Sequence, residues 1–282
     1  MSERPGRLDI VATPIGNLAD ASQRMREALD AADLVLAEDT RRSGRLLQQF
    51  GIKKPLFALH DHNETEATAH LVERLQRGEH MALVSDAGTP TISDPGFRLV
   101  RAARAAGVVV SPVPGPCAII AALSVSGLPT DRFCFEGFLP SKMKARLQRL
   151  EMLRAEPRSM VFYESVHRIE GMLIDTIDTF GGERAACLAR ELTKMHEQTV
   201  EGTLATIRQA VATGAVPLKG EFVVVIAGNT EAAEDAGAAQ VMLRVLLDEG
   251  VPVKSAARIA AKLTDQPRNA LYQVALNLQQ ER

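Results

Sequence analysis

The stretch with the clearest chemistry runs from Ser85 to Gly96. It contains hydroxyls, glycines, prolines and two carboxylates, Asp86 and Asp94, but neither lysine nor arginine. Because the lysine that a Walker A loop places on phosphates is missing, this stretch is not a P-loop. Backbone N–H groups, hydroxyls and carboxylates without a cation suit a polar ligand. The sequence therefore predicts a loop that binds a cationic or zwitterionic small molecule.

Two regular elements position this loop. A short apolar run from Met81 to Val84 has the length of a buried strand, and Phe97 to Ala106 shows helical spacing. A second loop of this kind, Thr13 to Asn17, follows the expected strand Leu8 to Ala12. Strands that alternate in this way with helices predict βαβ crossovers and a largely parallel sheet. Because ligands bind beyond the carboxyl ends of such strands, we expect a site there.

A change of pattern at Pro112 to Pro116 divides the α/β region, since three prolines in five residues interrupt regular structure. We predict an N-terminal α/β domain over residues 1–113. A second α/β domain, with a mixed sheet, is predicted over residues 114–230.

The C-terminal residues 231–282 show no strand pattern and predict a helical tail. Gly228 to Gly237 is acidic and rich in alanine, and we interpret it as a linker. Two later helices, separated by a turn at Thr264 to Pro267, are similar to a helix-turn-helix.

Composition narrows the class of protein. The 282 residues carry a formal net charge of −2, which argues against a strongly basic surface. The polar stretch from Met1 to Asp9 is no signal peptide, and no apolar run approaches the ~20 residues that span a bilayer. The three scattered cysteines form neither a disulfide framework nor a metal-ligand set, so we expect a cytoplasmic protein. Local contacts with nucleic acid would come from three basic clusters, Arg41 to Arg45, Lys142 to Arg149 and Lys254 to Arg268.

Spaced motifs recur along nearly the whole chain, and their combination is more specific than any one of them. They are Thr13-Pro14-Ile15-Gly16-Asn17-Leu18, Glu38-Asp39-Thr40-Arg41, Ser85-Asp86-Ala87-Gly88-Thr89-Pro90, Pro114-Gly115-Pro116, Phe135-Glu136-Gly137-Phe138-Leu139-Pro140, Tyr163-Glu164-Ser165-Val166-His167-Arg168, Ala189-Arg190-Glu191-Leu192-Thr193-Lys194 and Gly220-Glu221. Together they resemble the ribosomal RNA small-subunit methyltransferase I family of the tetrapyrrole-methylase-like superfamily. The resemblance implies two α/β domains with an S-adenosyl-L-methionine cleft between them. It also implies 2′-O-methylation of a cytidine in the decoding region of 16S rRNA, free or in the small ribosomal subunit, by a cytoplasmic homodimer without a membrane segment.

The resemblance also implies which residues hold the cofactor. Ser85 and Ala87 depart from the Gly and Pro of the wider superfamily, whereas Asp86 matches its Gly-Asp-Pro loop. Cys117 stands where a Ser or Thr is usual and is a weaker hydrogen-bond partner. The expected cofactor-binding residues are Pro14, Asp86, Ala87, Gly88, Thr89, Pro90, Ile92, Cys117, Ala118, Phe162, Tyr163, Ala189 and Phe222.

The methylated hydroxyl is a weak nucleophile, so a base must take its proton or a cation must stabilise the developing alkoxide. We predict that Glu164, Glu191, Lys194 and His196 supply these groups, and His60, Asp61, His167 and Arg168 are further candidates on neighbouring loops. The sequence does not choose the base among them. It predicts no metal site, because the spacing of His60, Asp61 and His62 favours a polar loop at the cleft.

The RNA contacts are predicted from charge. The expected residues are Asn17, Arg41, Arg42, Lys142, Lys144, Arg146, Arg168 and Arg268. Each feature also has a structural interpretation. Glu164 and His167 suit a helix cap, Glu38 to Arg42 a surface ion-pair network, and the basic helix a solvated face. The C-terminal helices are as suited to packing or to a dimer interface as to RNA.

Two other functions fit the same residues. A tetrapyrrole C-methyltransferase shares the fold, but the basic clusters and the helix-turn-helix-like tail disfavour it. A non-catalytic RNA-binding protein of ribosome assembly would also retain a cleft of this shape.

Overall fold

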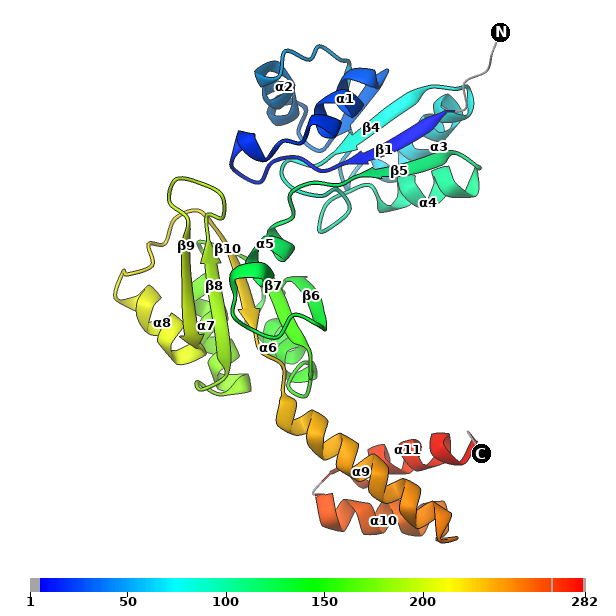
Figure 1. Ribbon diagram of the computed structural model, residues 1–282, viewed down its shortest axis with the longest axis vertical. Helices are drawn as coiled ribbons and strands as arrows, with labels where there is room; N and C mark the ends of the chain where they lie inside the picture. Colours follow the sequence, from blue (N-terminus) through cyan, green and yellow to red (C-terminus); the bar gives the residue numbers. More distant parts are fainter. Residues whose placement is uncertain (1–5, 265, 281–282) are drawn as a thin grey trace.

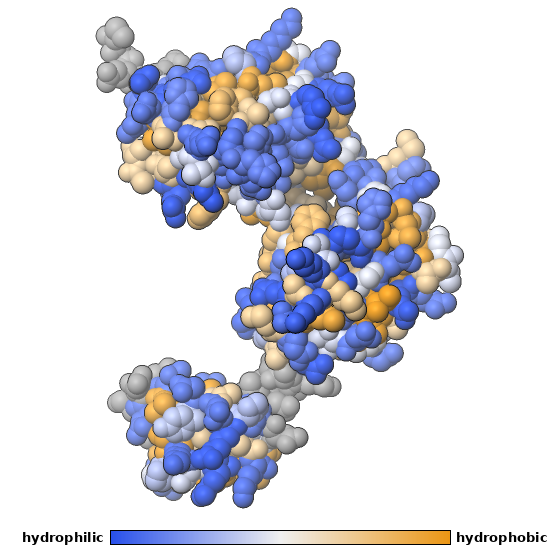
Figure 2. Space-filling view, turned by 180° about the vertical axis from the view of Figure 1, so that it is seen from behind, coloured by the Kyte–Doolittle hydropathy of each residue, from blue (hydrophilic) through white to orange (hydrophobic). Residues whose placement is uncertain are grey.

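The computed structural model describes residues 6–264 and 266–280, with only the backbone of residues 230–237 and of Gln280. Figure 1 shows three parts that follow one another along the chain: an upper α/β part, a middle α/β part, and three helices at the bottom. In Figure 2 the first two parts meet at a narrow neck, and hydrophilic and hydrophobic residues alternate over the visible face. Within the described residues, no helix is long and apolar enough to cross a membrane.

The first sheet is entirely parallel and has the strand order β3-β2-β4-β1-β5. Apolar residues on both faces of its central strands explain why helices cover both sides. One core joins the sheet to α1 and α2, and the opposite core joins it to α3 and α4. The elements are β1 (Arg7–Val11), η1 (Leu18–Asp20), α1 (Gln23–Ala31), β2 (Leu34–Ala37), α2 (Thr40–Gln49), β3 (Leu56–Ala58), α3 (Glu64–Gln76), β4 (His80–Val84), α4 (Phe97–Ala105) and β5 (Val109–Val113).

The second sheet is mixed and has the strand order β6-β7-β10-β8-β9, with β6 and β7 parallel and the other pairs antiparallel. Helices α6, α7 and α8 pack on one face, and α5 packs on the other. The elements are α5 (Ala118–Val125), β6 (Phe133–Phe138), α6 (Met143–Met152), β7 (Ser159–Ser165), α7 (Ile169–Phe180), β8 (Ala185–Arg190), β9 (Gln198–Thr203), α8 (Leu204–Ala212) and β10 (Glu221–Ile226). The predicted parallel and mixed sheets are both confirmed.

The last part contains α9 (Thr230–Asp248), α10 (Val253–Thr264) and α11 (Arg268–Gln280). They share a core that includes Leu243, Ala257 and Leu271. The linker interpretation of Gly228 to Gly237 is wrong, since α9 begins at Thr230; alanine and glutamate are strong helix formers. Two stretches considered above lie partly outside the described residues. They are Met1 to Asp9, of which residues 1–5 are not described, and the turn at Thr264 to Pro267, of which Asp265 is not described.

Two local features are decided only by the structure. Asp20 and Ser22 are both good N-cap residues by type, but Ser22 caps α1, because its side chain accepts a hydrogen bond from the Met25 N–H at 3.0 Å. Strand β5 continues through Pro112, which an edge strand tolerates because one side of it needs no N–H donor.

A buried carboxylate holds the start of α4 in place. Glu64 lies at the start of α3 with 5% of its surface exposed, and its Oε1 accepts three N–H groups, from Gly96 at 3.1 Å, Arg98 at 2.8 Å and Leu99 at 3.2 Å. It thus satisfies N–H groups that the first turn of a helix leaves without partners. This bond set fixes the far end of the loop from Ser85 to Gly96.

Replacing Glu64 by alanine is expected to lower the free energy of unfolding by about 2–4 kcal/mol, because buried N–H donors lose an ionised acceptor. Chemical denaturation measures the change. Glu66→Ala, on the exposed side of the same helix, is the control and is expected to stay within about 0.5 kcal/mol of the parent. Equal stabilities of the two variants would contradict the assignment.

Candidate active site

A cavity of about 390 Å³ lies at the carboxyl ends of β4 and β7, where the two sheets face each other. The first sheet contributes the loop after β4, with Asp86, Gly88 and Asp94 among its lining residues. The second sheet contributes the end of β7 and the start of β10, including Tyr163 and Glu221. The cavity therefore occupies the position where open α/β sheets bind ligands.

Backbone and side-chain bonds hold the loop after β4 against its neighbours. Thr13 and Gly88 exchange backbone hydrogen bonds of 2.9 and 3.1 Å, which join the loop to the one after β1. Thr89 Oγ1 donates to the Pro116 carbonyl at 3.1 Å. Asp86 Oδ1 accepts the Asp39 N–H at 3.1 Å, so the loop is also fixed to the end of β2.

Non-glycine residues with positive φ occur in the loop after β4 and in the loop after β8. Thr91 and Ser93 have φ of 72° and 65°, and Glu191 and Thr193 have φ of 50° and 66°. Such conformations are disfavoured for side chains with a Cβ and concentrate at functional sites. The two loops are thus shaped at a local energetic cost.

Aromatic rings form the apolar wall. Tyr163 contacts Phe135 edge-on, with ring centroids 4.9 Å apart, and its ring centroid lies 5.6 Å from that of Phe138. Burial is the main reason why the pKa of Tyr163 is raised, so this phenol stays neutral at physiological pH. Such a wall suits the flat face of an aromatic ligand.

The side of the cavity opposite the aromatic wall is acidic. Burial first, and then the charges of Glu38 and Asp86, raise the pKa of Asp94 to about 6. Burial and the Asp86 charge likewise raise the pKa of Glu38. The loop sequence contains no cation, but the fold brings Arg42 from α2 to the cavity, where its Nη1 pairs with Asp86 Oδ2 at 2.9 Å. The remaining acids give this side a negative potential.

A lysine and two carboxylates meet at the cavity rim. Lys194 Nζ lies 2.7 Å from Glu191 Oε1 and 2.9 Å from Glu221 Oε2. Burial by itself would lower the pKa of Lys194, but these hydrogen bonds outweigh it and raise the pKa. The pKa of Glu191 is lowered: burial opposes ionisation, yet the bond to Lys194 prevails. At neutral pH this cluster therefore presents an ammonium held by ionised carboxylate.

The predicted catalytic residues lie in different surroundings. Glu164 is 2% exposed and lines the cavity; burial raises its pKa, and Arg168 Nη2 lies 3.3 Å from its Oε2. Glu191 and Lys194 form the rim cluster. His196 is exposed, and its carbonyl accepts a hydrogen bond from Arg190. Neither Glu164 nor His167 caps α7, because Arg168 occupies the N-cap position.

Most of the predicted cofactor residues meet at one place. The cavity is lined by Asp86, Ala87, Gly88, Thr89, Ile92, Cys117, Ala118, Tyr163 and Phe222. Pro14 lines a neighbouring cavity instead. Phe162 and Ala189 are fully buried in the cores on the two faces of the second sheet, and Pro90 is not among the lining residues.

The predicted RNA-binding residues fall into two groups, those that are exposed and those that are already paired within the protein. Lys142, Lys144 and Arg268 are exposed. Arg146 is 9% exposed, and its Nε lies 2.5 Å from Asp175 Oδ2, so its charge is already used in a buried ion pair. Arg168 is likewise occupied, by Glu164 and the Leu139 carbonyl. Asn17 caps the short helix η1 by accepting the Ala19 N–H at 3.0 Å. Arg41 pairs with Asp39 at 2.9 Å.

Comparison with known proteins identifies the family. The profile of Tetrapyrrole (Corrin/Porphyrin) Methylases matches residues 7–208, and that of the RsmI C-terminal HTH domain matches residues 233–279. The ribosomal RNA small subunit methyltransferase I of Xylella fastidiosa (strain Temecula1 / ATCC 700964) is 54% identical over 272 residues, covering 95% of this chain and 98% of the relative. The chain belongs to the ribosomal RNA small subunit methyltransferase I family.

A second relative carries the same name, and a solved structure has the same fold. The protein of the same name from Escherichia coli O157:H7 is 50% identical and covers 97% of this chain and 96% of its own length. A crystal structure of uroporphyrin-III C-methyltransferase from Thermus thermophilus, complexed with S-adenosyl homocysteine, matches with a TM-score of 0.54 at 18% identity. It covers 79% of this chain and 97% of that chain. This likeness confirms the predicted tetrapyrrole-methylase-like fold of the family member.

The cavity is also lined by residues that are not among the expected cofactor contacts. They include Ile15, Ser93, Asp94 and Phe138. Asp94 carried a signal, since it is the second carboxylate of the loop after β4. Phe138 carried none, because a strand-end phenylalanine predicts core packing as readily as a ligand contact.

Proposed function

We propose that this chain transfers a methyl group from S-adenosyl-L-methionine to the ribose 2′-hydroxyl of a cytidine in the decoding region of 16S rRNA. The observation that carries the proposal is the cavity between the two sheets, which has an aromatic wall on one side and an acidic wall on the other. Relatives at about half identity, matched over nearly their whole length, are named for methylation of small-subunit rRNA. The motif resemblance supports the cytidine and its 2′-hydroxyl.

The cavity fits a cofactor that joins an adenosyl group to a positively charged sulfonium. Tyr163 and Phe138 offer aromatic faces to an adenine ring. Asp86, Asp94 and Glu221 line the same cavity and give carboxylates to a cationic ligand. The only described lining residue with a permanent positive charge is Arg42, which Asp86 neutralises.

When bound, S-adenosyl-L-methionine would supply an electrophilic methyl group for in-line transfer to the ribose oxygen, with S-adenosylhomocysteine as the leaving group. The chain mainly aligns the two reactants, a contribution that is large for such a displacement. Lys194 stays protonated, so it acts as a cation beside the developing alkoxide and not as a base. Glu191 is ionised and positions the ammonium, and its second oxygen can accept the proton.

Cofactor affinity is expected to rise with pH through about 6. The pKa of Asp94 is about 6, so its carboxyl is mainly neutral at pH 5 and charged at pH 8. Because a charged Asp94 attracts a cationic ligand, the dissociation constant at pH 5 is expected to be roughly 5- to 10-fold higher than at pH 8. Calorimetry measures it. Asp94→Asn is expected to remove this dependence, and a parent without it would contradict the role of Asp94.

A methylation assay tests the function. The chain is incubated with radiolabelled S-adenosyl-L-methionine and either free 16S rRNA or assembled small subunits, and the labelled nucleotide is mapped by nuclease digestion and mass spectrometry. We expect label on a cytidine ribose, resistant to alkaline cleavage. Label on a base, or on a porphyrin offered in competition, would overturn the ribose assignment. Cofactor binding without label on any RNA would favour a non-catalytic role.

The assembly and the division of the chain complete the proposal. We propose a cytoplasmic homodimer, which is supported by the exposed apolar side chains Ile120 and Val125 on α5. Light scattering measures the mass in solution. We also retain domain boundaries at residues 113 and 230, supported by the end of β5 at Val113 and the start of α9 at Thr230.

A further inference from the structure

A second cavity, of about 260 Å³, opens between the loop after β1 and helix α2. It shares Arg42 and Asp86 with the larger cavity, so the two adjoin each other. Its volume is below the 300–1,000 Å³ usual for pockets that hold a whole drug-sized ligand. A part of a larger molecule, which also occupies the first cavity, fits it better.

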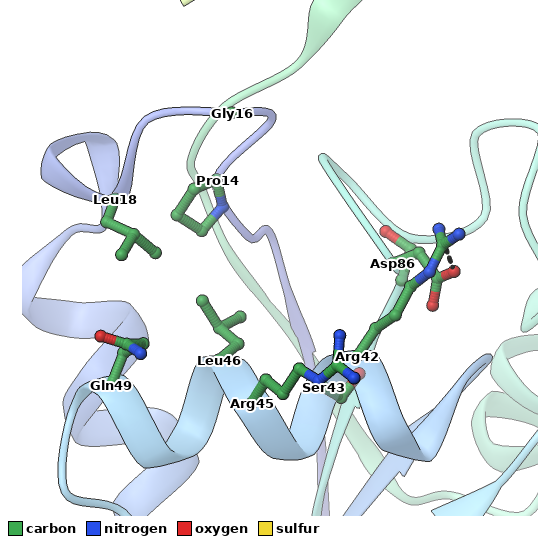
Figure 3. A pocket seen from close by; sticks show the side chains of 10 residues that line it. Pro14, Gly16, Leu18, Arg42, Ser43, Arg45, Leu46, Gln49 and Asp86 are labelled. Atoms are coloured by element: carbon green, nitrogen blue, oxygen red, sulfur yellow. Dashed lines mark hydrogen bonds and ion pairs between the residues drawn. The ribbon is translucent and has the colours of Figure 1, made fainter. Parts of the chain in front are cut away.

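One end of this second cavity is apolar. In Figure 3 the Leu46 side chain points from α2 toward Pro14 and Leu18 on the loop above it, and Gln49 lies below Leu18. Leu18 is 44% exposed, so it leaves apolar surface uncovered at this end of the cavity. An apolar surface beside an amide suits an unstacked nucleobase, whose face packs and whose edge forms hydrogen bonds.

The other end is cationic. Arg41 and Arg42 are paired with Asp39 and Asp86, whereas the guanidinium of Arg45 forms no hydrogen bond or ion pair with any residue that the structure describes. In Figure 3 the Arg45 side chain runs along α2 toward Arg42. A guanidinium without a carboxylate partner is suited to a phosphate.

The second cavity also borders the rim cluster, to which Lys194 belongs. Gly16 lines it, and a Cβ added to Gly16 would lie 2.4 Å from Lys194 Cγ. The loop after β1 therefore touches the lysine that we place beside the reacting hydroxyl. A nucleotide in the second cavity would be adjacent in space to the ribose that is methylated.

We propose that the second cavity binds a nucleotide neighbouring the methylated cytidine, with its base on Pro14, Leu18 and Leu46 and its phosphate on Arg45. This inference rests on the proposed function and adds a specificity subsite to it. The chemistry is that of a single-stranded, unstacked RNA segment, since a paired base would not enter a pocket of this size.

Arg45→Ala and Leu46→Ala test the two ends. For both variants we expect a 5- to 10-fold higher KM for RNA with unchanged cofactor affinity by calorimetry, that is, about 1 kcal/mol per contact. In Arg45→Ala the slope of log affinity for RNA against log salt is expected to fall by about 0.7, the loss of one phosphate contact. Leu46→Ala is expected to keep that slope.

Gln48→Ala, next to Gln49 on α2, and Arg104→Ala, an exposed cation on α4, are matched controls and are expected to behave as the parent. Thermal melting checks the fold of every variant. Parent-like KM and salt slope in Arg45→Ala, while the parent methylates RNA, would overturn the subsite alone. Weakened cofactor binding in either variant would assign the second cavity to the cofactor and would also overturn the subsite. A parent that leaves RNA unmethylated would overturn the proposed function.

Discussion

Replacing Asp86 by alanine is expected to weaken S-adenosyl-L-methionine binding by roughly 100-fold, because the change removes three contributions at once. Asp86 fixes the loop after β4 to the Asp39 N–H, neutralises Arg42, and adds a carboxylate to the acidic wall. Without it, Arg42 remains as an unpaired cation beside a cationic ligand. Losing hydrogen bonds of an ionised partner costs about 1.5–3 kcal/mol. Calorimetry on the full chain measures the dissociation constant.

Asp86→Asn separates these contributions. The amide oxygen can still accept the Asp39 N–H, but it no longer neutralises Arg42. We expect an intermediate loss of affinity that grows at low salt, where unscreened charges act over longer distances. Asp20→Ala, an exposed aspartate in η1, is the control. Parent-like cofactor affinity in Asp86→Ala would reject the assignment of this loop.

Lys194→Met is expected to lower kcat by roughly 10²- to 10³-fold, the usual effect of removing one group that stabilises charge in a transition state. The methionine keeps the length of the side chain but loses the ammonium that lies between Glu191 and Glu221. Because we place Lys194 at the rim, cofactor affinity is expected to change little. Single-turnover kinetics with labelled cofactor and RNA measure the chemical step.

Lys194→Arg preserves the charge and is expected to recover part of kcat. Lys53→Met, an exposed lysine in the loop after α2, is the control for loss of a positive charge. If Lys194→Met changed cofactor affinity and left kcat intact, the lysine would belong to the binding site and not to the catalytic cluster.

Local patterns predicted the regular elements well, because their signals are short-range. The run Met81 to Val84 is fully apolar and bounded by polar residues, and it forms the buried strand β4. The start of a helix has a weaker signal: Asp20 and Ser22 are both good N-cap residues by type, and only the structure shows that Ser22 caps α1. The linker error at Gly228 to Gly237 arose because an acidic, alanine-rich composition also suits a helix.

Charge patterns predicted surface function poorly where a partner came from a distant part of the chain. Arg146 belongs to a basic segment, yet its guanidinium is buried against Asp175 on α7. In the sequence, Glu64 is an ordinary acidic residue in the first turn of a helix, yet in the structure its carboxylate accepts N–H groups at the start of α4. Neither role has a local signal, because each depends on a residue about 30 positions away.

The loop from Ser85 to Gly96 was recognisable as a ligand-binding loop from its residues alone, because turn-forming residues after an apolar run are a local property. Motif spacing along the chain was enough to indicate the family and its cofactor. The fold was needed to show that Arg42 comes to Asp86, that Tyr163 faces this loop from the other sheet, and that Lys194 touches Gly16. These contacts join residues far apart in the sequence, so they follow from how the two sheets pack and not from any periodicity.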